Sequence, residues 1–435
     1  MSHRRGPRPL PAHLTLALGR AWLSLASIPS APMPGMAPSA PGSMPWSASW
    51  PGFAPRSPEA RAEHRRILHA LRGGADPEGF RAAVLRRLQQ EDAALLRGIV
   101  AYRDHPWRRD LPAPPTLWSD GPARLLDYGG ADRAAPAALF VPSLVNRASV
   151  LDLMPGHSML RWMAGAGLRP LLLDWGEPGA AEHRLSLGDL IAGRLERGLA
   201  AAARAAGGPV VLVGYCMGGL LALAAALRRP DLVRGLVLLA TPWDFHAGGA
   251  EARARARASA DILPSLEPVM AATGGLPVDF LQLAFAGLDP FGIARKFRAF
   301  GRLDPASPRA AHFVALEDWL NDGVPLPAPV ARECLGGWYG ANTPLSGEWR
   351  VAGEAVDPAA WRGPAFVAIP RGDRIVPPES ARALAARLPA ATVLDVPAGH
   401  IGMAAGLRAE TALWRPLRDW VLGLPRGAGR APDAE

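Results

Sequence analysis

The stretch Val210-Val-Leu-Val-Gly-Tyr-Cys-Met-Gly-Gly219 constrains the fold more than any other part of the chain. It opens on four apolar residues, which is typical of a strand buried on both faces of a parallel sheet. Gly214 and Gly218 flank Cys216, because a tight strand-to-helix turn leaves no room for a Cβ beside its central residue. The residues up to Arg228 then favour a helix. The stretch therefore predicts a strand, a sharp turn that presents Cys216, and a helix; a structural cysteine in a Gly-rich turn is the alternative.

Strand-like and helix-like segments alternate from about residue 114 onward. Short apolar runs lie at 137–142, 168–174, 210–214, 235–240, 365–369 and 392–396. Helical stretches lie at about 151–166, 187–206, 218–228, 379–388 and 411–423. This alternation predicts a mostly parallel central sheet flanked by helices. Together with the cysteine at a strand-to-helix turn, it predicts the α/β-hydrolase fold.

The interval 244–361 breaks this alternation, because it contains helical stretches and no strong strand. It is too long for a loop between two strands, so we expect a largely helical cap over the sheet. We also expect a small helical N-terminal region over 57–110. The core is then divided into 111–243 and 362–425, and a disordered tail covers 426–435.

Residues 1–56 form a leader rich in small residues and proline, which we expect to be disordered and of low complexity. Near its start, basic residues precede a mildly apolar run that Arg20 interrupts. A surface-adsorbing amphipathic segment and a secretory signal therefore remain alternatives.

Composition excludes several classes of protein. The chain carries 48 Lys+Arg against 39 Asp+Glu, but only Lys296 is lysine and the arginines are spread along the chain, which argues against nucleic-acid binding. No apolar run is long enough to span a bilayer. Cys216 and Cys334 give neither a disulfide framework nor a metal-ligand spacing, so we expect a cytoplasmic protein without a metal, and Cys334 as an inert buried residue.

The predicted fold also specifies where partners of a nucleophilic Cys216 should lie. They are an acid after the next-to-last strand and a histidine after the last one. Asp373 and His400 occupy these positions. Each has a plainer interpretation, as a turn-capping aspartate and a loop histidine, and Asp395 is an alternative acid. The order along the chain favours a Cys216–His400–Asp373 triad.

Further candidates surround this triad. The backbone N–H of Met217, at the start of a helix, and that of Leu144 or Val145, after an early strand, are candidate oxyanion donors. Four more residues are candidate substrate contacts: Tyr215, Asn146, Trp175 and His246. Trp175 could instead pack under the active-site loops, and His246 could be an ordinary loop residue.

A cysteine nucleophile under a large cap favours acyl transfer. A thiolate attacks thioesters readily and forms a thioester that can pass its acyl group to an alcohol, provided that the cap excludes water.

Several motifs resemble the polyhydroxyalkanoate synthases, especially the catalytic subunit of the two-subunit class III type. They are Val145-Asn-Arg147 with Leu151-Asp-Leu153, Asp174-Trp175-Gly176, Gly214-Tyr-Cys-Met-Gly-Gly219, Thr241-Pro-Trp-Asp-Phe-His246, Glu317-Asp-Trp-Leu-Asn-Asp322, Asp373-Arg-Ile-Val-Pro-Pro378 and Gly399-His-Ile-Gly402. The resemblance covers about residues 110–425. The N-terminal part is longer than that of a minimal class III subunit and shorter than the class I domain, which leaves the need for a partner subunit open.

The resemblance implies polymerisation of (R)-3-hydroxyacyl-coenzyme A at a granule surface in the cytoplasm, with coenzyme A as leaving group and no cofactor. Cys216 would hold the acyl chain, His400 would act as the base and Asp373 would orient His400 or assist the incoming hydroxyl. Partners would be the substrate, the growing polyester, and a second synthase subunit or a second copy of the chain. A cysteine thioesterase, esterase or depolymerase on the same fold is the alternative, and an inactive granule-associated scaffold is a third hypothesis.

Overall fold

The computed structural model describes residues 4–26, 58–73, 76–129 and 134–425, and every structural statement below refers to these residues. The chain divides into two compact units. The smaller unit combines Met1–Pro106 with Asp289–Ala311, and the larger unit combines Trp107–Leu288 with His312–Glu435.

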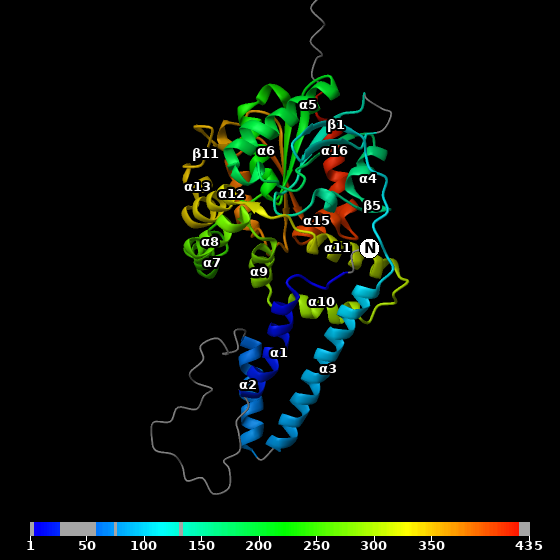
Figure 1. The fold of residues 1–435 in the computed structure, drawn as a ribbon, viewed down its shortest axis with the longest axis vertical. Coiled ribbons are helices and arrows are strands. Elements are labelled where there is room, and N and C mark those ends of the chain that lie inside the picture. The colour runs from blue at the N-terminus through cyan, green and yellow to red at the C-terminus, as the bar shows by residue number, and fades with distance from the viewer. Residues whose placement is uncertain (1–3, 27–57, 74–75, 130–133, 426–435) are drawn as a thin grey trace, which may run out of the picture. The chain divides into compact units, whose positions relative to one another are not determined.

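An eight-stranded sheet forms the centre of the larger unit, with strand order β1-β2-β6-β3-β7-β8-β13-β14 (Figure 1). The strands are β1 (Thr116–Asp120), β2 (Ala123–Asp127), β3 (Ala137–Val141), β6 (Arg169–Asp174), β7 (Val210–Tyr215), β8 (Val233–Leu239), β13 (Ala365–Pro370) and β14 (Ala391–Val396). From β6 to β14 all neighbours are parallel, whereas β2 is antiparallel to β1 and β6. All six predicted strands are present, and the antiparallel β1–β2 pair is an addition.

Helices cover both faces of this sheet (Figure 1). One face carries α5 (Glu196–Ala206), α6 (Met217–Arg228) and α14 (Pro378–Arg387); the other carries α4 (Met159–Gly165), α15 (His400–Ala405) and α16 (Arg415–Gly423). Successive strand residues serve opposite faces, as the pleat requires. Leu139 and Leu212 pack with the first helix layer, while Phe140 and Val213 pack with the second. This is the predicted α/β architecture.

The segment between β8 and β13 is largely helical, as expected for the cap. Its helices are α7 (Ala250–Asp261), α8 (Leu263–Thr273), α9 (Val278–Leu288), α10 (Gly292–Phe300), α11 (Pro308–Asn321), α12 (Ala328–Arg332) and α13 (Thr343–Ser346). Two short antiparallel pairs accompany them, β9 (Gly275–Leu276) with β10 (Leu326–Pro327) and β11 (Arg350–Val351) with β12 (Glu354–Ala355). The cap is not one body, however, because α10 belongs to the smaller unit.

The smaller unit is an assembly of helices: α1 (Leu10–Ala26), α2 (Pro58–Arg72), α3 (Pro77–Asp104) and α10. The carboxylate of Asp76 caps α3 by accepting a hydrogen bond from the N–H of Glu78. Gly98 permits close packing of α3 on α10, since a Cβ there would lie 2.0 Å from the carbonyl oxygen of Phe297.

Part of the leader, expected to be disordered or weakly helical, is ordered, because residues 10–26 form α1. The helix packs against α3, and its Ala17 is buried. Arg20 interrupts the apolar run at one position only, and the helix continues through it. The rest of the leader, residues 27–56, and the tail over 426–435 lie outside the described residues.

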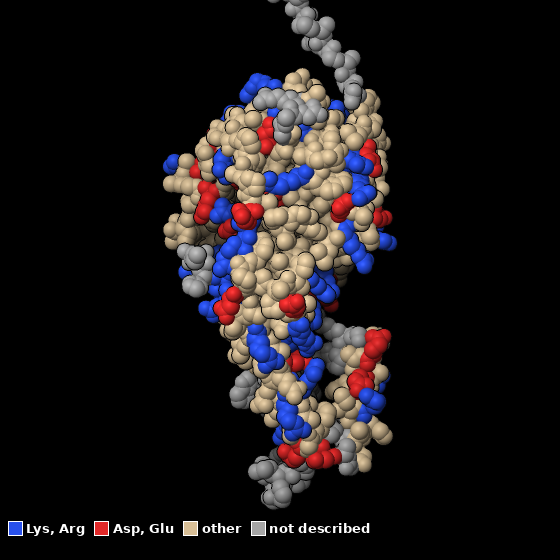
Figure 2. Space-filling model, turned by 90° about the vertical axis from the view of Figure 1, so that its right-hand side faces the viewer, with Lys and Arg blue, Asp and Glu red and all other residues tan. Residues whose placement is uncertain are grey.

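Surface features of the described residues are simple. No helix in that part of the chain combines the length and apolar composition that crossing a membrane requires. On the face seen in Figure 2, basic side chains are scattered among acidic and uncharged ones.

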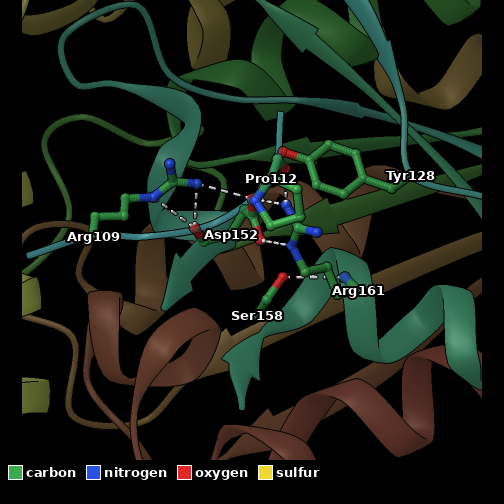
Figure 3. Close-up of polar contacts among 6 residues, drawn as sticks. All are labelled: Arg109, Pro112, Tyr128, Asp152, Ser158 and Arg161. Atoms are coloured by element: carbon green, nitrogen blue, oxygen red, sulfur yellow. Dashed lines mark hydrogen bonds and ion pairs between the residues drawn. The ribbon is translucent and has the colours of Figure 1, made fainter. Parts of the chain in front are cut away.

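A buried ionic cluster around Asp152 anchors the start of the larger unit (Figure 3). Its carboxylate oxygens accept hydrogen bonds from Arg161 Nε (2.8 Å), Arg109 Nη2 (2.9 Å) and the Tyr128 hydroxyl (3.2 Å). Arg161 Nη2 also donates to the carbonyl of Pro112. The cluster thus ties the segment that enters the sheet domain to the loop after β3. Burial is the main reason why the pKa of Tyr128 is raised, with the Asp152 charge contributing.

We expect Asp152→Asn to lower the free energy of unfolding of the larger unit by about 2–4 kcal/mol, because the two arginines would then face a neutral amide in place of the carboxylate. Both arginines are partly exposed, so water offsets some of the loss. Urea unfolding followed by tryptophan fluorescence measures the change. Asp231→Asn is the control, since Asp231 forms an exposed pair with Arg229 and should cost under about 1 kcal/mol. Equal shifts in both variants would contradict the anchoring role.

Candidate active site

Cys216 lies at the turn between β7 and α6 in a strained backbone conformation, with φ 55° and ψ −126°. A non-glycine residue in such a region costs about 1–3 kcal/mol and persists only where its surroundings enforce it. Here the N–H of Cys216 donates to the carbonyl of Leu239 (2.8 Å), and its own carbonyl accepts from the N–H of Gly219 (2.9 Å). The strain is typical of a nucleophile elbow, as the sequence predicts.

Close backbone approaches explain the glycines around the elbow. A Cβ on Gly214 would lie 2.4 Å from the Cα of Gly219, and a Cβ on Gly218 would lie 2.1 Å from the carbonyl oxygen of Val141. Neither contact can be relieved by a side-chain rotation, because the obstructing atoms are backbone. The turn can therefore form only with glycine at both positions.

Asp373 and His400 meet at the same edge of the sheet, after β13 and β14. His400 Nδ1 donates a hydrogen bond to Asp373 Oδ2 at 2.6 Å, and both side chains are buried. The other oxygen of Asp373 accepts from the N–H groups of Ile375 (2.8 Å) and Val376 (2.9 Å). The carboxylate is thus fixed on both oxygens and can orient the imidazole.

Asp395, the alternative acid, is placed differently. It pairs with Arg382 at 2.6 Å, and its side chain is about half exposed. The geometry therefore favours Asp373 as the partner of His400.

The imidazole of His400 also interacts with Cys216. Burial is the largest influence on its pKa and lowers it, but the charge of Cys216 and hydrogen bonds to Asp373 and Cys216 together outweigh burial. The net effect of these influences is to raise the pKa of His400 to about 10. A protonated imidazole beside the sulfur stabilises negative charge that develops there, which a nucleophilic cysteine requires.

Tyr215 holds this histidine in place. Its hydroxyl donates to the backbone carbonyl of His400 at 3.1 Å, and the two ring centroids are 5.3 Å apart. Burial, followed by the charges of Cys216 and Asp373, raises the pKa of Tyr215, so the hydroxyl stays a donor. Tyr215 is expected from the sequence to contact substrate, and the structure adds this positioning contact.

A small cavity of about 90 Å³ opens beside the triad. Cys216 and His400 line it together with Asn146 and Tyr215. The cap adds four further lining residues, Gln282, Phe285, Trp319 and Leu320. Of these, the sequence analysis names Trp319 and Leu320 inside a motif and misses Gln282 and Phe285, because the way a cap folds over a sheet depends on tertiary contacts. The cavity is small and partly open to solvent, so a short acyl group on Cys216 would fit within it.

The candidate oxyanion donors lie at the turns flanking the cavity. Met217 is the first residue of α6, where backbone N–H groups are unpaired within the helix. The N–H of Val145, which lines the cavity, donates to Ser143 Oγ at 3.3 Å, and Leu144 is buried in the core. The roles of Met217, Val145 and Leu144 in stabilising an oxyanion stay predictions.

Trp175 and His246 do not line this cavity. Trp175 Nε1 donates to the carbonyl of Pro142 at 3.1 Å, and this hydrogen bond supports the loop that leads to Val145. His246 Nε2 donates to the carbonyl of Tyr339 at 2.8 Å and so ties the start of the cap to a later part of it. Contact of either residue with substrate remains a prediction.

With this geometry established, comparison with known proteins identifies the class. A family model described as alpha/beta hydrolase fold matches residues 171–406, which is more than half of the chain. The chain therefore belongs to the α/β-hydrolase fold family.

Its similarity to curated relatives is more specific. It is 28% identical over 303 residues to the poly(3-hydroxyalkanoate) polymerase subunit PhaC of Haloferax mediterranei, which covers 68% of this chain and 61% of that protein. It is 29% identical to the PhaC subunits of Synechocystis sp. (65% of this chain, 76% of that one) and Allochromatium vinosum (67% and 82%). These matches confirm the resemblance to polyhydroxyalkanoate synthases that the motifs indicate. The match spans less than two thirds of the first relative's own length.

We expect Asp373→Asn to reduce acylation of Cys216 by p-nitrophenyl acetate about 10²–10⁴-fold, because an amide in place of the carboxylate no longer stabilises the required tautomer and charge of His400. Release of p-nitrophenol measures the reaction. Asp395→Asn is the matched control and should retain the wild-type rate. A greater loss of rate in Asp395→Asn than in Asp373→Asn would show that Asp395, and not Asp373, is the acid of the triad.

The raised pKa of His400 predicts how Cys216 alkylation depends on pH. With a pKa of about 10, His400 stays an imidazolium at pH 7, where a free imidazole is mostly neutral, so wild-type Cys216 beside it should react readily with iodoacetamide at pH 7. In His400→Gln the rate at pH 7 should fall roughly tenfold or more, because an unassisted thiol ionises only near pH 8.5. The two rates should converge as the pH rises. Mass analysis of the Cys216 peptide measures alkylation of Cys216 separately from that of Cys334. Equal rates for the wild-type protein and His400→Gln at pH 7 would contradict an effect of the His400 charge on Cys216.

Proposed function

We propose that this protein is an acyltransferase that polymerises (R)-3-hydroxyacyl-coenzyme A into polyhydroxyalkanoate through an acyl-enzyme on Cys216. The observation that carries the proposal is a cysteine at the elbow, beside the His400–Asp373 pair, in a chain similar to PhaC subunits. Coenzyme A leaves as part of the substrate, and no cofactor takes part.

The first half-reaction is acylation. Sγ of Cys216 attacks the thioester carbonyl, the carbon–sulfur bond to coenzyme A breaks, and the imidazolium of His400 gives its proton to the departing thiolate. The N–H of Met217 and that of Leu144 or Val145 stabilise the negative charge on the carbonyl oxygen of the tetrahedral intermediate by donating hydrogen bonds to it. The exchange of one thioester for another is close to thermoneutral, so positioning is the main demand on the protein.

The second half-reaction is transfer to a hydroxyl. His400 accepts the proton of the acceptor hydroxyl, the hydroxyl oxygen attacks the acyl carbon, and the thiolate of Cys216 leaves as the new ester forms. Asp373 stabilises the imidazolium produced in this step. The acceptor is the hydroxyl end of a second acyl unit or of the growing chain.

The cavity favours transfer over hydrolysis. Most of the side chains around Cys216 are apolar, among them Phe285, Trp319, Leu320 and Ile401, so water is scarce beside the acyl-enzyme. The cap residues Phe285, Trp319 and Leu320 lie at this cavity, so movement of the cap would widen the access to Cys216.

The proposal includes the setting of the reaction. The growing polyester is insoluble, so the enzyme would act at a granule surface in the cytoplasm, either with a second synthase subunit or as a homodimer. Unlike a minimal catalytic subunit, the chain has its own helical unit, which leaves both assemblies open to test.

We expect the purified protein to release coenzyme A from (R)-3-hydroxybutyryl-coenzyme A and to form insoluble polymer, and Cys216→Ala to lose both. A thiol reagent measures coenzyme A, and methanolysis with mass analysis measures polymer. Cys334→Ala is the matched control and should keep both activities, because Cys334 is buried away from the cavity.

Two outcomes would overturn this proposal. Release of free hydroxyacid without polymer, also when plausible partner subunits are supplied, would assign the protein to the thioesterase or depolymerase alternative. No acyl mass on the Cys216 peptide would identify an inactive scaffold.

A further inference from the structure

The helix that carries the triad histidine is too short to hold its own position. α15 spans only His400–Ala405, and a helix of this length is unstable in isolation. The last carbonyls of a helix have no partner within it, so they need donors from elsewhere. The place of the His400 imidazole beside Cys216 therefore depends on the tertiary contacts at the two ends of α15. At the first end, Tyr215 donates to the carbonyl of His400.

Three ring nitrogens, each from a different part of the chain, donate to three consecutive carbonyls at the other end of the helix. The pairs are Trp414 Nε1 with Ala404 (3.0 Å), His312 Nε2 with Ala405 (2.8 Å) and His157 Nε2 with Gly406 (3.0 Å). The rings also pack on one another, since the ring centroid of His157 lies 4.9 Å from that of His312 and 5.9 Å from that of Trp414. This aromatic cluster fixes the end of α15 from several directions.

His312 is the donor of this cluster that the cap supplies. It lies on α11, in the part of that helix that belongs to the larger unit, and its side chain is buried. Two turns further along, the same helix carries Trp319 and Leu320, which line the cavity beside Cys216. Because a continuous helix moves as one body, a displacement of α11 at the cavity also moves His312 and strains its hydrogen bond to α15.

The protonation state of His312 suits a fixed contact. Burial lowers the pKa of His312 more than the hydrogen bond to the carbonyl of Ala405 raises it. The ring is therefore neutral at pH 7, and a neutral imidazole has a single N–H to donate. In this structure His312 donates that N–H to Ala405.

We propose that His312 is a positioning residue for the triad. Its hydrogen bond to the carbonyl of Ala405 keeps α15 where the imidazole of His400 meets the sulfur of Cys216, and it makes the reactivity of Cys216 depend on the place of the cap helix α11. The inference deepens the proposed function and rests on His400 acting as the base in it.

Alkylation of Cys216 by iodoacetamide at pH 7 tests this inference without any acyl substrate. His312→Phe keeps a ring to pack on His157 and removes the donor, so the rate should fall about fivefold or more. His312→Gln keeps a side-chain N–H and should recover most of the wild-type rate. At about pH 10 all three proteins should react alike, because a thiol then ionises without help.

Cys334 reports in the same mass spectra whether the fold is intact, because it is buried in the native protein and should stay unlabelled. A role in stability alone would expose Cys334 and would not be relieved by restoring one N–H. If His312→Phe exposes Cys334, His312→Asn replaces it, since its amide is one carbon shorter than that of Gln and should show the same loss of rate.

His105→Phe is the matched control. His105 is also buried, and its Nε2 donates to the carbonyl of Pro305 at 2.9 Å within the smaller unit. This variant should alkylate at the wild-type rate.

An unchanged rate in the variants without the donor, no recovery in His312→Gln, or an equal fall in His105→Phe would overturn the inference alone. Equal rates at pH 7 in the wild-type protein and in His400→Gln would overturn the role of His400 in the proposed function, and the inference with it. The two failures are thus distinguished by which variant matches the wild-type protein.

Discussion

The hydrogen bond between His400 and Asp373 depends on the alignment of the last two strands. β13 and β14 pair in parallel up to Pro370 and Val396. The pairing continues past the strand ends, because the N–H of Arg371 donates to the carbonyl of Val396 and the N–H of Gly372 donates to that of Ala398. Two loops held together in this way bring a carboxylate and an imidazole that are 27 residues apart to within 2.6 Å. A slip of one residue between these strands would separate them.

The imidazole in turn has to meet a sulfur presented by a different strand. The elbow supplies it through a backbone strain at Cys216 that its neighbours enforce. Glycines at 214 and 218 let backbone segments touch, and the hydrogen bond from Cys216 to Leu239 ties the turn to the neighbouring strand β8. The reactive group is therefore placed by the rigid core of the sheet. The cavity beside it is lined both by loops at the strand ends and by four cap residues, so the core and the cap shape it together.

The sequence predicts the parts that local pattern determines. The strand before Cys216, the glycines around it, and the order of acid and histidine all follow from rules of one fold, and the structure places Asp373 and His400 together as those rules require. The sequence does not predict the features that depend on packing between distant segments. Nothing local indicates that α10 leaves the cap to join α3 through the close approach at Gly98, or that α1 packs as a helix against α3.

The role of individual side chains around the triad is similarly hard to foresee. Tyr215 could be singled out as the neighbour of the nucleophile, but its bond to the carbonyl of His400 depends on where α15 begins. Likewise β1 is short and mostly exposed, so its pairing at the edge of the sheet leaves a weak trace in the sequence. In each case the information lies in a contact between distant segments.

The same segment that is predicted to bind the oxyanion also receives the cap. Val324 and Trp319 donate to the carbonyls of Val145 and Arg147, and Arg147 forms an ion pair with Asp322 at 3.1 Å. If the cap opens to admit the substrate of the proposed reaction, it must break bonds to the loop that holds Val145 and Asn146. Closure would then restore that loop at the moment when the acyl group is in place. A single set of contacts can thus couple exclusion of water to assembly of the site, which is what transfer to an alcohol in place of hydrolysis demands.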